Sequence, residues 1–394
     1  MKKVLAIILS LVLVLTLVVA VACDNENFKE VNLEDKETRE EFVNALAEKI
    51  DRDTLLSGDP TKEGWTFGLE ETAKSKLNLD LALTPAQAAA AEEADSSKFT
   101  VKGNVELSES AKATVKSNGK ADPTVAASLS LSAKGNLEAS DNLWALLDTV
   151  AQESKINGED FDLVETVKAL VTNFNYSIDA YADNEAALIK LSDGLYNKLP
   201  KFVTDMIGSK LIKITYGGSA EAATLSAAEG SDLVADAEKA ALKVAINNVI
   251  DTVIIPFKIS VAVSTTNGYA VKLTVSQQSV LTVLDSALKD LAKDNAALAT
   301  SIKNAIGADT KIELVVKVDK EGAFSSFSVD SKFSLNLDLT VASVGNVKGT
   351  VTLSGSVEVK KFKGTVSKPK NASEYKEIEG ISGPNSSDEV VENG

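Results

Sequence analysis

The sequence predicts an α+β protein in which a large, curved antiparallel sheet is covered on its apolar face by long amphipathic helices. Long stretches alternate between apolar and polar residues, for example at 125–139 and 327–341. This period of two, with one polar face throughout, is typical of antiparallel strands that have one solvated face. Strands of about fifteen residues reach roughly 50 Å, far beyond the usual five or six residues. Such lengths favour a large twisted sheet over a compact sandwich.

The first elements expected are a helix and two short strands. Thr38 and Glu41 can form a capping box, which predicts the start of a helix over 37–57. The hydrophobic period then changes from 3.6 to 2, and this change predicts strands at 65–70 and 77–83.

Two long strand regions follow the same design. The first, 99–139, turns near Asn118-Gly119, and the second, 312–359, turns near Gly345-Asn346. We expect odd-numbered residues of the best-alternating stretches to face inward. Glycines on the apolar side would let the sheet bend, make room for helix packing, or leave room for a ligand. These glycines are Gly103, Gly135, Gly349 and Gly355.

Long helices are predicted over 231–254 and 277–306, where apolar residues recur at helical spacing. They would span roughly 36 and 45 Å, long enough to lie along the strands and cover their apolar face. The remaining expected elements are helices at 141–152 and 160–171, and strands at 173–182, 186–192, 210–216, 259–264 and 271–276.

The elements predict one domain, 37–362, followed by a disordered acidic tail, 363–394, where the periodicity is lost. Within the domain, the order helix, strand, strand at the start recurs from residue 231. This recurrence indicates an internal repeat with halves at about 37–216 and 231–362.

Composition excludes several classes of chemistry. The chain has no histidine and a single cysteine, Cys23. These absences exclude Ser-His-Asp and Cys-His catalysis, zinc sites built on imidazole or thiolate, and disulfides inside the domain. We therefore expect no enzyme activity, no cofactor and no metal site.

Charge argues against a nucleic-acid partner. The net charge is −16, and the chain without its first 22 residues carries 39 basic and 57 acidic residues, a net −18. An acidic surface repels phosphate backbones and anionic headgroups. Aromatic residues make up only 5% of the chain, so stacking platforms for bases or sugars are scarce. The sequence indicates no particular protein partner.

The first 22 residues have the layout of a signal peptide. Two lysines precede an apolar run, Val4–Val19, and small residues, Ala20–Ala22, come before Cys23. This pattern resembles a bacterial lipoprotein signal, in which the cysteine is acylated and becomes the new N-terminus. The alternatives are a chance cysteine after a secretory signal and a transmembrane anchor, for which the run is short. We expect Cys23 to be lipidated, 23–36 to be a polar tether, and the protein to be membrane-anchored in the bacterial cell envelope, in the periplasm or at the surface.

The sequence contains only incomplete matches to known catalytic and metal-binding motifs. Ser286–Lys289 and Ser140–Asn142 match two of the penicillin-recognising signatures, but in reverse order and without a Lys-Thr-Gly triplet. Ser140 and Asp141 are instead typical of a helix N-cap. Acidic residues at 159–162 lack the spacing and the glycine of an EF-hand, and acids at a helix start favour the dipole.

The whole plan resembles the half-barrel lipoprotein-carrier fold and related lipid-transport lipoproteins, over about residues 36–362. In that family an apolar cavity between sheet and helices holds acyl chains. The resemblance implies a non-enzymatic, membrane-tethered binder or carrier of a lipid or other apolar ligand. The alternative is a structural or surface-interaction lipoprotein with a solid core and no ligand.

The candidate ligand-binding residues are leucines that alternate inward at mid-strand. They are Leu129, Leu131, Leu335, Leu337 and Leu353. A ligand cavity is typically about 300 Å³ or more, whereas a packed core holds few voids larger than a water molecule.

Overall fold

The computed structural model describes residues 27–49, 62–85, 98–117, 123–153, 162–216, 232–289, 293, 295–341 and 345–378. The expectations for the signal peptide and for the lipidated Cys23 lie outside these residues. So do residues 50–57 of the predicted helix at 37–57 and residues 379–394 of the predicted tail.

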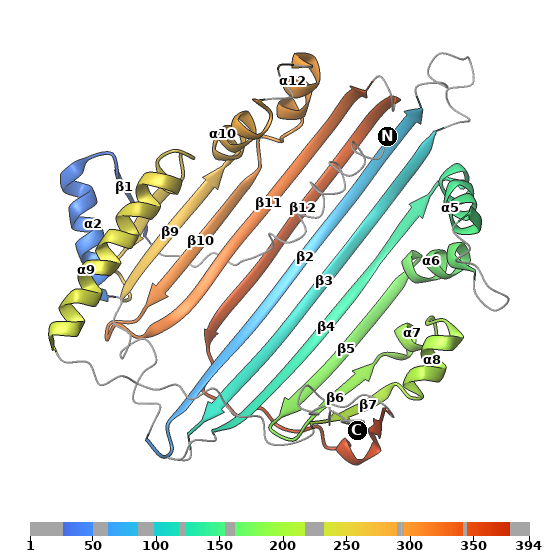
Figure 1. Cartoon of the computed structure of the whole chain (residues 1–394), viewed down its shortest axis with the longest axis horizontal. Helices are drawn as coiled ribbons and strands as arrows, with labels where there is room; N and C mark the ends of the chain where they lie inside the picture. Colours follow the sequence, from blue (N-terminus) through green and yellow to red (C-terminus); the bar gives the residue numbers. More distant parts are fainter. Residues whose placement is uncertain are drawn as a thin grey trace, which may run out of the picture.

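A single 13-stranded sheet forms the body of the protein (Figure 1). Its order is β1-β8-β9-β10-β11-β12-β2-β3-β4-β5-β6-β7-β13. The strands are β1 (Lys29–Val31), β2 (Thr66–Pro85), β3 (Phe99–Lys116), β4 (Thr124–Ala139), β5 (Phe174–Asp183), β6 (Ala186–Leu191), β7 (Leu211–Thr215), β8 (Ser260–Ser264), β9 (Tyr269–Ser276), β10 (Lys311–Val318), β11 (Phe324–Val341), β12 (Gly345–Lys361) and β13 (Lys376–Glu377). The strands pair antiparallel except for β13, which runs parallel to β7, so the sheet is mixed.

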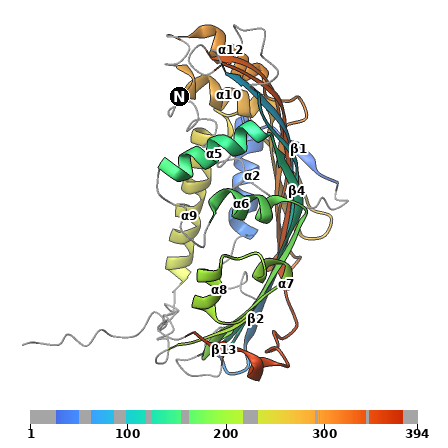
Figure 2. The same cartoon turned by 90° about the vertical axis from the view of Figure 1, so that its right-hand side faces the viewer.

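Helices lie on one side of this sheet (Figure 2). They stand in two groups, with α2, α9, α10 and α12 toward one end of the sheet and α5 to α8 toward the other (Figure 1). The helices are α2 (Lys36–Lys49), α5 (Asp141–Glu153), α6 (Leu163–Val171), α7 (Asp193–Tyr196), α8 (Lys201–Ile207), α9 (Asp232–Val249), α10 (Gln277–Ala287) and α12 (Ala296–Asn304). The π-helical turn η1 (Ile250–Ile254) extends α9, and the 3-10 turn η2 (Ala372–Glu374) precedes β13. The predicted α+β class is confirmed.

Two antiparallel meanders share the sheet. Strands β2 to β7 form one meander, and β8 to β12 form the other. They join where β12 pairs with β2 along almost the whole length of both strands, with Val351 opposite Leu79. The strand that ends the second meander thus lies beside the strand that begins the first, and the longest strands occupy the centre of the sheet.

The two faces of the sheet differ as the alternation predicts. We call the face toward the helices the inner face. Leu335 and Val351, which are paired across β11 and β12, lie on it and are each only 4% exposed. Ser130 and Thr350 lie on the opposite, outer face and are exposed. Odd-numbered residues of the long strands β2, β3, β4, β11 and β12 therefore point inward, as expected.

Ser334 is an exception, because it is buried on the outer face. Its hydroxyl donates a hydrogen bond to Asp309, and its backbone N–H donates to the Thr310 hydroxyl at 3.3 Å. The chain that precedes β10 lies beside β11 here, where Ile306 forms an antiparallel bridge with Leu335, and its Asp309 and Thr310 cover Ser334.

Cross-strand ion pairs tie the outer face together. Glu106 on β3 contacts Lys76 on β2 and Lys134 on β4, each at 2.9 Å. These hydrogen bonds hold the pKa of the Glu106 carboxyl at about 2, below its ordinary value of 4.5. Opposite charges at directly paired positions support the register of neighbouring strands.

The two short strands predicted at 65–70 and 77–83 are one continuous strand, β2. The intervening residues are polar on both faces, which suggested a break. In the sheet, β12 and β3 pair with β2 on both sides through this stretch, so the backbone hydrogen bonds of 71–76 are satisfied within the ladder. The predicted repeat needs two separate strands here, so its correspondence of elements does not hold.

The single helix predicted over 277–306 is also wrong, because α10 ends at Ala287 and α12 begins at Ala296. Asn295 caps the second helix, since its side chain accepts a hydrogen bond from the Leu298 backbone N–H at 3.0 Å. An Asn in this position competes with continuation of a helix. Lys303 forms an ion pair with Asp285 and links the two pieces.

The segment after residue 363 is structured through residue 378, where disorder was expected. Its strand β13 pairs with β7 at the edge of the sheet, with Lys376 opposite Ile212. Backbone pairing rather than hydrophobic periodicity holds this segment, which explains why the sequence pattern did not reveal it. At the other edge, β1 covers β8 in the same way. Short strands at both edges limit the unpaired backbone groups that would favour aggregation.

Candidate ligand-binding clefts

An apolar cleft of about 410 Å³ lies between the helices α2 and α9 and the strands β9 and β10. We call it the helix–sheet cleft. Its lining residues are Phe42, Leu46, Lys49, Leu242, Ala245, Ile246, Val249, Ile250, Ile254, Tyr269, Val271, Leu273, Leu314, Val316 and Val318. The volume exceeds the few water-sized voids of a packed core and falls within the range of ligand sites.

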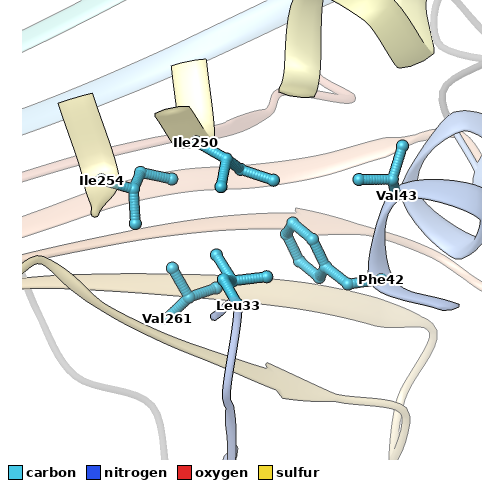
Figure 3. Packing of buried hydrophobic residues seen from close by; sticks show 6 residues of the cluster. All are labelled: Leu33, Phe42, Val43, Ile250, Ile254 and Val261. Carbon is cyan, nitrogen blue, oxygen red and sulfur yellow. The ribbon is translucent and has the colours of Figure 1, made fainter. Parts of the chain in front are cut away.

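A packed cluster under the helices fixes the wall of this cleft. Leu33, Phe42, Val43, Ile250, Ile254 and Val261 lie together and bring α2, η1 and β8 into contact (Figure 3). The members are between 0% and 7% exposed. The helices therefore rest on a solid base, and the cleft opens beside this base rather than through it.

An ion pair joins α2 to η1 near the cleft. The Arg39 guanidinium donates two hydrogen bonds to the Asp251 carboxylate, at 2.7 and 2.8 Å, and a third to the Asn247 side chain at 2.8 Å. These contacts lower the pKa of Asp251 through hydrogen bonding to the arginine. Two-point arginine pairs fix orientation as well as distance, so the angle between α2 and η1 is well determined.

The chemistry of the helix–sheet cleft is almost entirely apolar. Among the described lining residues, Lys49 is the one charged residue, and Tyr269 brings the one hydroxyl. Burial raises the pKa of that phenol, which therefore stays protonated at neutral pH. Val249 and Val316 are 49% and 39% exposed, so apolar surface is left open in the cleft. The arrangement can hold a hydrocarbon along its apolar lining.

Two further clefts lie on the inner face of the central strands. One is about 510 Å³, and its lining residues are Ala73, Lys74, Ser75, Leu107, Ser108, Glu109, Leu131, Ser132, Ala133, Tyr176, Ser177, Ile178, Leu195 and Val357. The other is about 470 Å³, and its lining residues are Leu69, Glu71, Ala111, Lys112, Ala113, Ala127, Ser128, Leu129, Ala180, Tyr181, Ala182, Ala187, Ile189 and Val359. Both span β2 to β5, and we call them together the central groove.

Small residues create the space of the central groove. Ala73 and Ala111 occupy inner-face positions on β2 and β3. Farther along the same two strands, the inner-face positions carry larger residues such as Leu77 and Val105. Leu107 points to this side and is 48% exposed. The apolar face of the sheet is therefore packed in some places and open in others.

The five predicted wall residues divide between these two environments. Leu131 and Leu129 each line one cleft of the central groove. Leu335 and Leu337 belong to a cluster packed against α10 and the residues that follow α12, and Leu353 pairs with Phe333 of the same cluster. Leu335 and Leu353 are 4% and 5% exposed.

The packed environment is a second hydrophobic cluster. Its buried members are Ala305, Ile306, Phe333, Leu335 and Val351, and its partly buried neighbours are Leu77, Leu79, Leu81, Val280, Leu281, Leu284 and Leu337. Here the helix α10 and the end of α12 sit directly on β11, β12 and β2. This part of the inner face is solid core.

Sequence reasoning missed the lining of the helix–sheet cleft. The cleft is lined from the predicted shorter strands by alternating residues, Val271, Leu273, Leu314 and Val316, whereas the predicted wall residues lie on the longer strands. The apolar alternation of β9 and β10 opposite the apolar stripe of α9 was the available signal.

Two residues of the motifs weighed for chemistry, Ser140 and Asp162, make structural hydrogen bonds. The Ser140 hydroxyl accepts a hydrogen bond from the Thr100 backbone N–H at 3.0 Å, just before α5 begins. Asp162 caps α6 by accepting a hydrogen bond from the Glu165 backbone N–H at 2.9 Å. Within the described ranges, no three His, Cys, Asp or Glu residues are grouped as they would be to hold a metal ion. No helix in the described part of the chain is both long and apolar enough to span a membrane.

Comparison with known proteins gives no assignment: no protein-family model matches the chain, and no curated protein matches it significantly.

Proposed function

We propose that this protein is a membrane-anchored, extracytoplasmic bacterial lipoprotein that binds or carries a lipid or other apolar ligand without enzymatic chemistry. The ligand lies in the helix–sheet cleft, between α2 and α9 on one side and β9 and β10 on the other. The fold is then used as in half-barrel lipoprotein carriers, with amphipathic helices covering the apolar sheet face. The observation that carries the proposal is an apolar cleft of about 410 Å³ in which Lys49 is the single charged residue among the described lining.

The energetics favour a hydrocarbon ligand in this cleft. Each buried methylene contributes about 0.8 kcal/mol, so an acyl chain gains several kcal/mol without any polar contact. Val249 and Val316 are exposed at the cleft, and covering their apolar surface with a hydrocarbon is favourable. A charged small molecule would find only Lys49 as a partner.

The alternative is a structural or surface-interaction lipoprotein with a solid core. The packed cluster around Leu335 and Val351 favours it for that part of the inner face. The two functions differ in one observable, which is the presence of a bound apolar molecule.

The direct test is mass spectrometry of organic extracts from the mature chain purified with Cys23→Ser. We expect a lipid or similar apolar molecule in a fixed ratio to protein. Binding of a fluorescent fatty acid to the delipidated protein then provides the variant assay. Val316→Trp should block uptake, because the ring fills the cleft at a 39% exposed position.

Val125→Trp is the matched control. Val125 has the same 39% exposure on β4 but lines neither the helix–sheet cleft nor the central groove. Uptake unchanged by Val316→Trp, together with no lipid in the extracts, would establish the solid-core alternative.

The anchor has its own test. Cys23→Ser in the full chain should release the protein from membranes into the soluble fraction, because acylation at this position supplies the attachment. A mutant that stays with membranes as tightly as the wild type would refute lipidation at Cys23.

A further inference from the structure

The inner face of the central strands is mostly apolar, and it carries two carboxylates. Glu71 on β2 pairs with Ala111 on β3, and Ala73 on β2 pairs with Glu109 on β3. The two glutamates are therefore diagonal neighbours across one strand pair. On β2, β3, β4 and β5, which are described throughout, they are the only charged residues at inner-face positions.

Each carboxylate lies in open space rather than in packed core. Glu109 lines the cleft of about 510 Å³, and Glu71 lines the cleft of about 470 Å³. Around them the inner-face positions hold small residues, which keep the floor of the groove low. Leucines on β4 line the same clefts. Leu131 lies opposite Glu109, and Leu129 lies opposite Ala111. A polar point at the centre of a wide apolar floor is the layout of a site for an amphiphile.

The protein itself provides no counter-charge to this pair in the described ranges. Neither glutamate takes part in an ion pair there. The two lysines that border the clefts, Lys74 and Lys112, occupy outer-face positions, and Lys112 pairs with Glu70 at 3.1 Å.

The two carboxylates of the pair interact unfavourably with one another. Burial and the neighbouring Glu109 carboxylate raise the pKa of Glu71. Two like charges beside apolar surface are each partly desolvated and repel one another. A cation placed between them would relieve both effects.

We propose that the central groove binds a cationic amphiphile, with a protonated amine between Glu71 and Glu109 and a hydrocarbon tail along Leu107, Leu129 and Leu131. Charge complementarity selects the head, and the apolar floor holds the tail. An anionic lipid is disfavoured here, because its headgroup would face two carboxylates. The inference adds a second site with its own ligand class. It uses none of the lining of the helix–sheet cleft, so either proposal can fail alone.

The test compares three probes of equal chain length by isothermal titration calorimetry, below their critical micelle concentrations. The probes are dodecylamine, dodecanol and dodecanoate, and the protein is the mature chain with Cys23→Ser. We expect dodecylamine to bind at least about tenfold more tightly than dodecanol, since a charge-assisted hydrogen bond is worth that factor or more. Dodecanoate should bind most weakly to this site.

Glu71→Gln combined with Glu109→Gln should remove the preference for the amine and leave dodecanol binding unchanged. The single Glu109→Gln variant should reduce the preference in part. The matched control is Glu70→Gln with Glu106→Gln, which removes the same charge from the same two strands on the outer face. This control should keep the preference, because both inner-face carboxylates stay in place. A preference that came only from general attraction of an amine to an acidic protein would fall equally in the control and in the inner-face variant.

Three results would overturn the inference. Dodecylamine could bind no more tightly than dodecanol, the inner-face double variant could retain the preference, or the outer-face control could lose it equally. Val316→Trp separates the two proposals, since it should leave amine binding intact. Loss of amine binding in Val316→Trp would place the amine in the helix–sheet cleft and refute a site in the central groove.

Discussion

Replacing Leu335 by alanine tests whether the inner face beneath α10 is solid core. The Leu335 side chain is 4% exposed and packs among Ile306, Phe333 and Val351, which are also buried. Truncation removes three carbons from a site that packed side chains surround. The transfer term alone is about 2 kcal/mol, and the cavity left behind brings the loss of unfolding free energy to about 2–5 kcal/mol.

The matched comparison is Leu131→Ala. Leu131 occupies the equivalent inward position on β4, but it is only partly buried and lines the central groove. Its truncation enlarges an existing cleft instead of making a new cavity, so we expect a loss of about 1 kcal/mol, the lower part of the core range.

The assay is urea unfolding followed by circular dichroism, with both variants measured against the same parent protein. Parallel slopes would show that the midpoint shift reports stability alone. Leu335→Trp provides a second reading, because a ring in solid core overpacks and costs roughly 1–3 kcal/mol. Equal losses for Leu335→Ala and Leu131→Ala, or a tolerated tryptophan, would refute the distinction between packed and open inner face.

Three further predictions concern local contacts. Glu106→Gln should lower the free energy of unfolding at pH 7. The difference from the wild type should shrink as pH falls from about 4.5 toward 2, because the Glu106 carboxylate, whose pKa is lowered, loses its contribution when it is protonated. Urea titrations at several pH values measure this difference, and a difference independent of pH would contradict the prediction. Gly349→Ala should lower the free energy of unfolding by roughly 1–3 kcal/mol, since Gly349 has φ +140° and an added Cβ would lie 1.9 Å from the Asp80 carbonyl oxygen. A thermal melt measures this loss, and an unchanged melting temperature would show that the strand shifts to make room for the methyl group. Arg39→Ala should speed amide hydrogen exchange in α2 and lower the global free energy of unfolding by about 1 kcal/mol or less, because it removes a partly exposed ion pair with Asp251. Unchanged exchange in α2 would mean that packing alone holds the helix.

The sequence by itself determined the class of structure and the two faces of the sheet. Alternation over fifteen residues requires an extended chain, and it assigned Leu335 and Leu131 to one side and Ser130 to the other before any contact was known. The helices at 141–152 and 231–254 followed from helical spacing in the same way. These are properties of neighbouring residues, so local pattern suffices.

The tertiary structure decided where chain segments meet. The pairing of β12 with β2 stabilises a continuous β2 through a polar stretch that looks like a break in the sequence. The local alternation of apolar and polar residues cannot reveal a pairing partner about 270 residues away, because the backbone hydrogen bonds between strands carry no sequence signature. The edge strand β13 was unforeseen for the same reason.

The tertiary structure also decided which apolar positions are core and which line a cleft. Leu335 and Leu131 have the same alternating pattern, yet α10 and the end of α12 pack over the first while the second borders open space. The same holds for Glu71 and Glu109, which lie 38 residues apart in the sequence and become diagonal neighbours only through the register of β2 with β3. Periodicity specifies the face on which a side chain lies, and packing between distant segments specifies what covers that face.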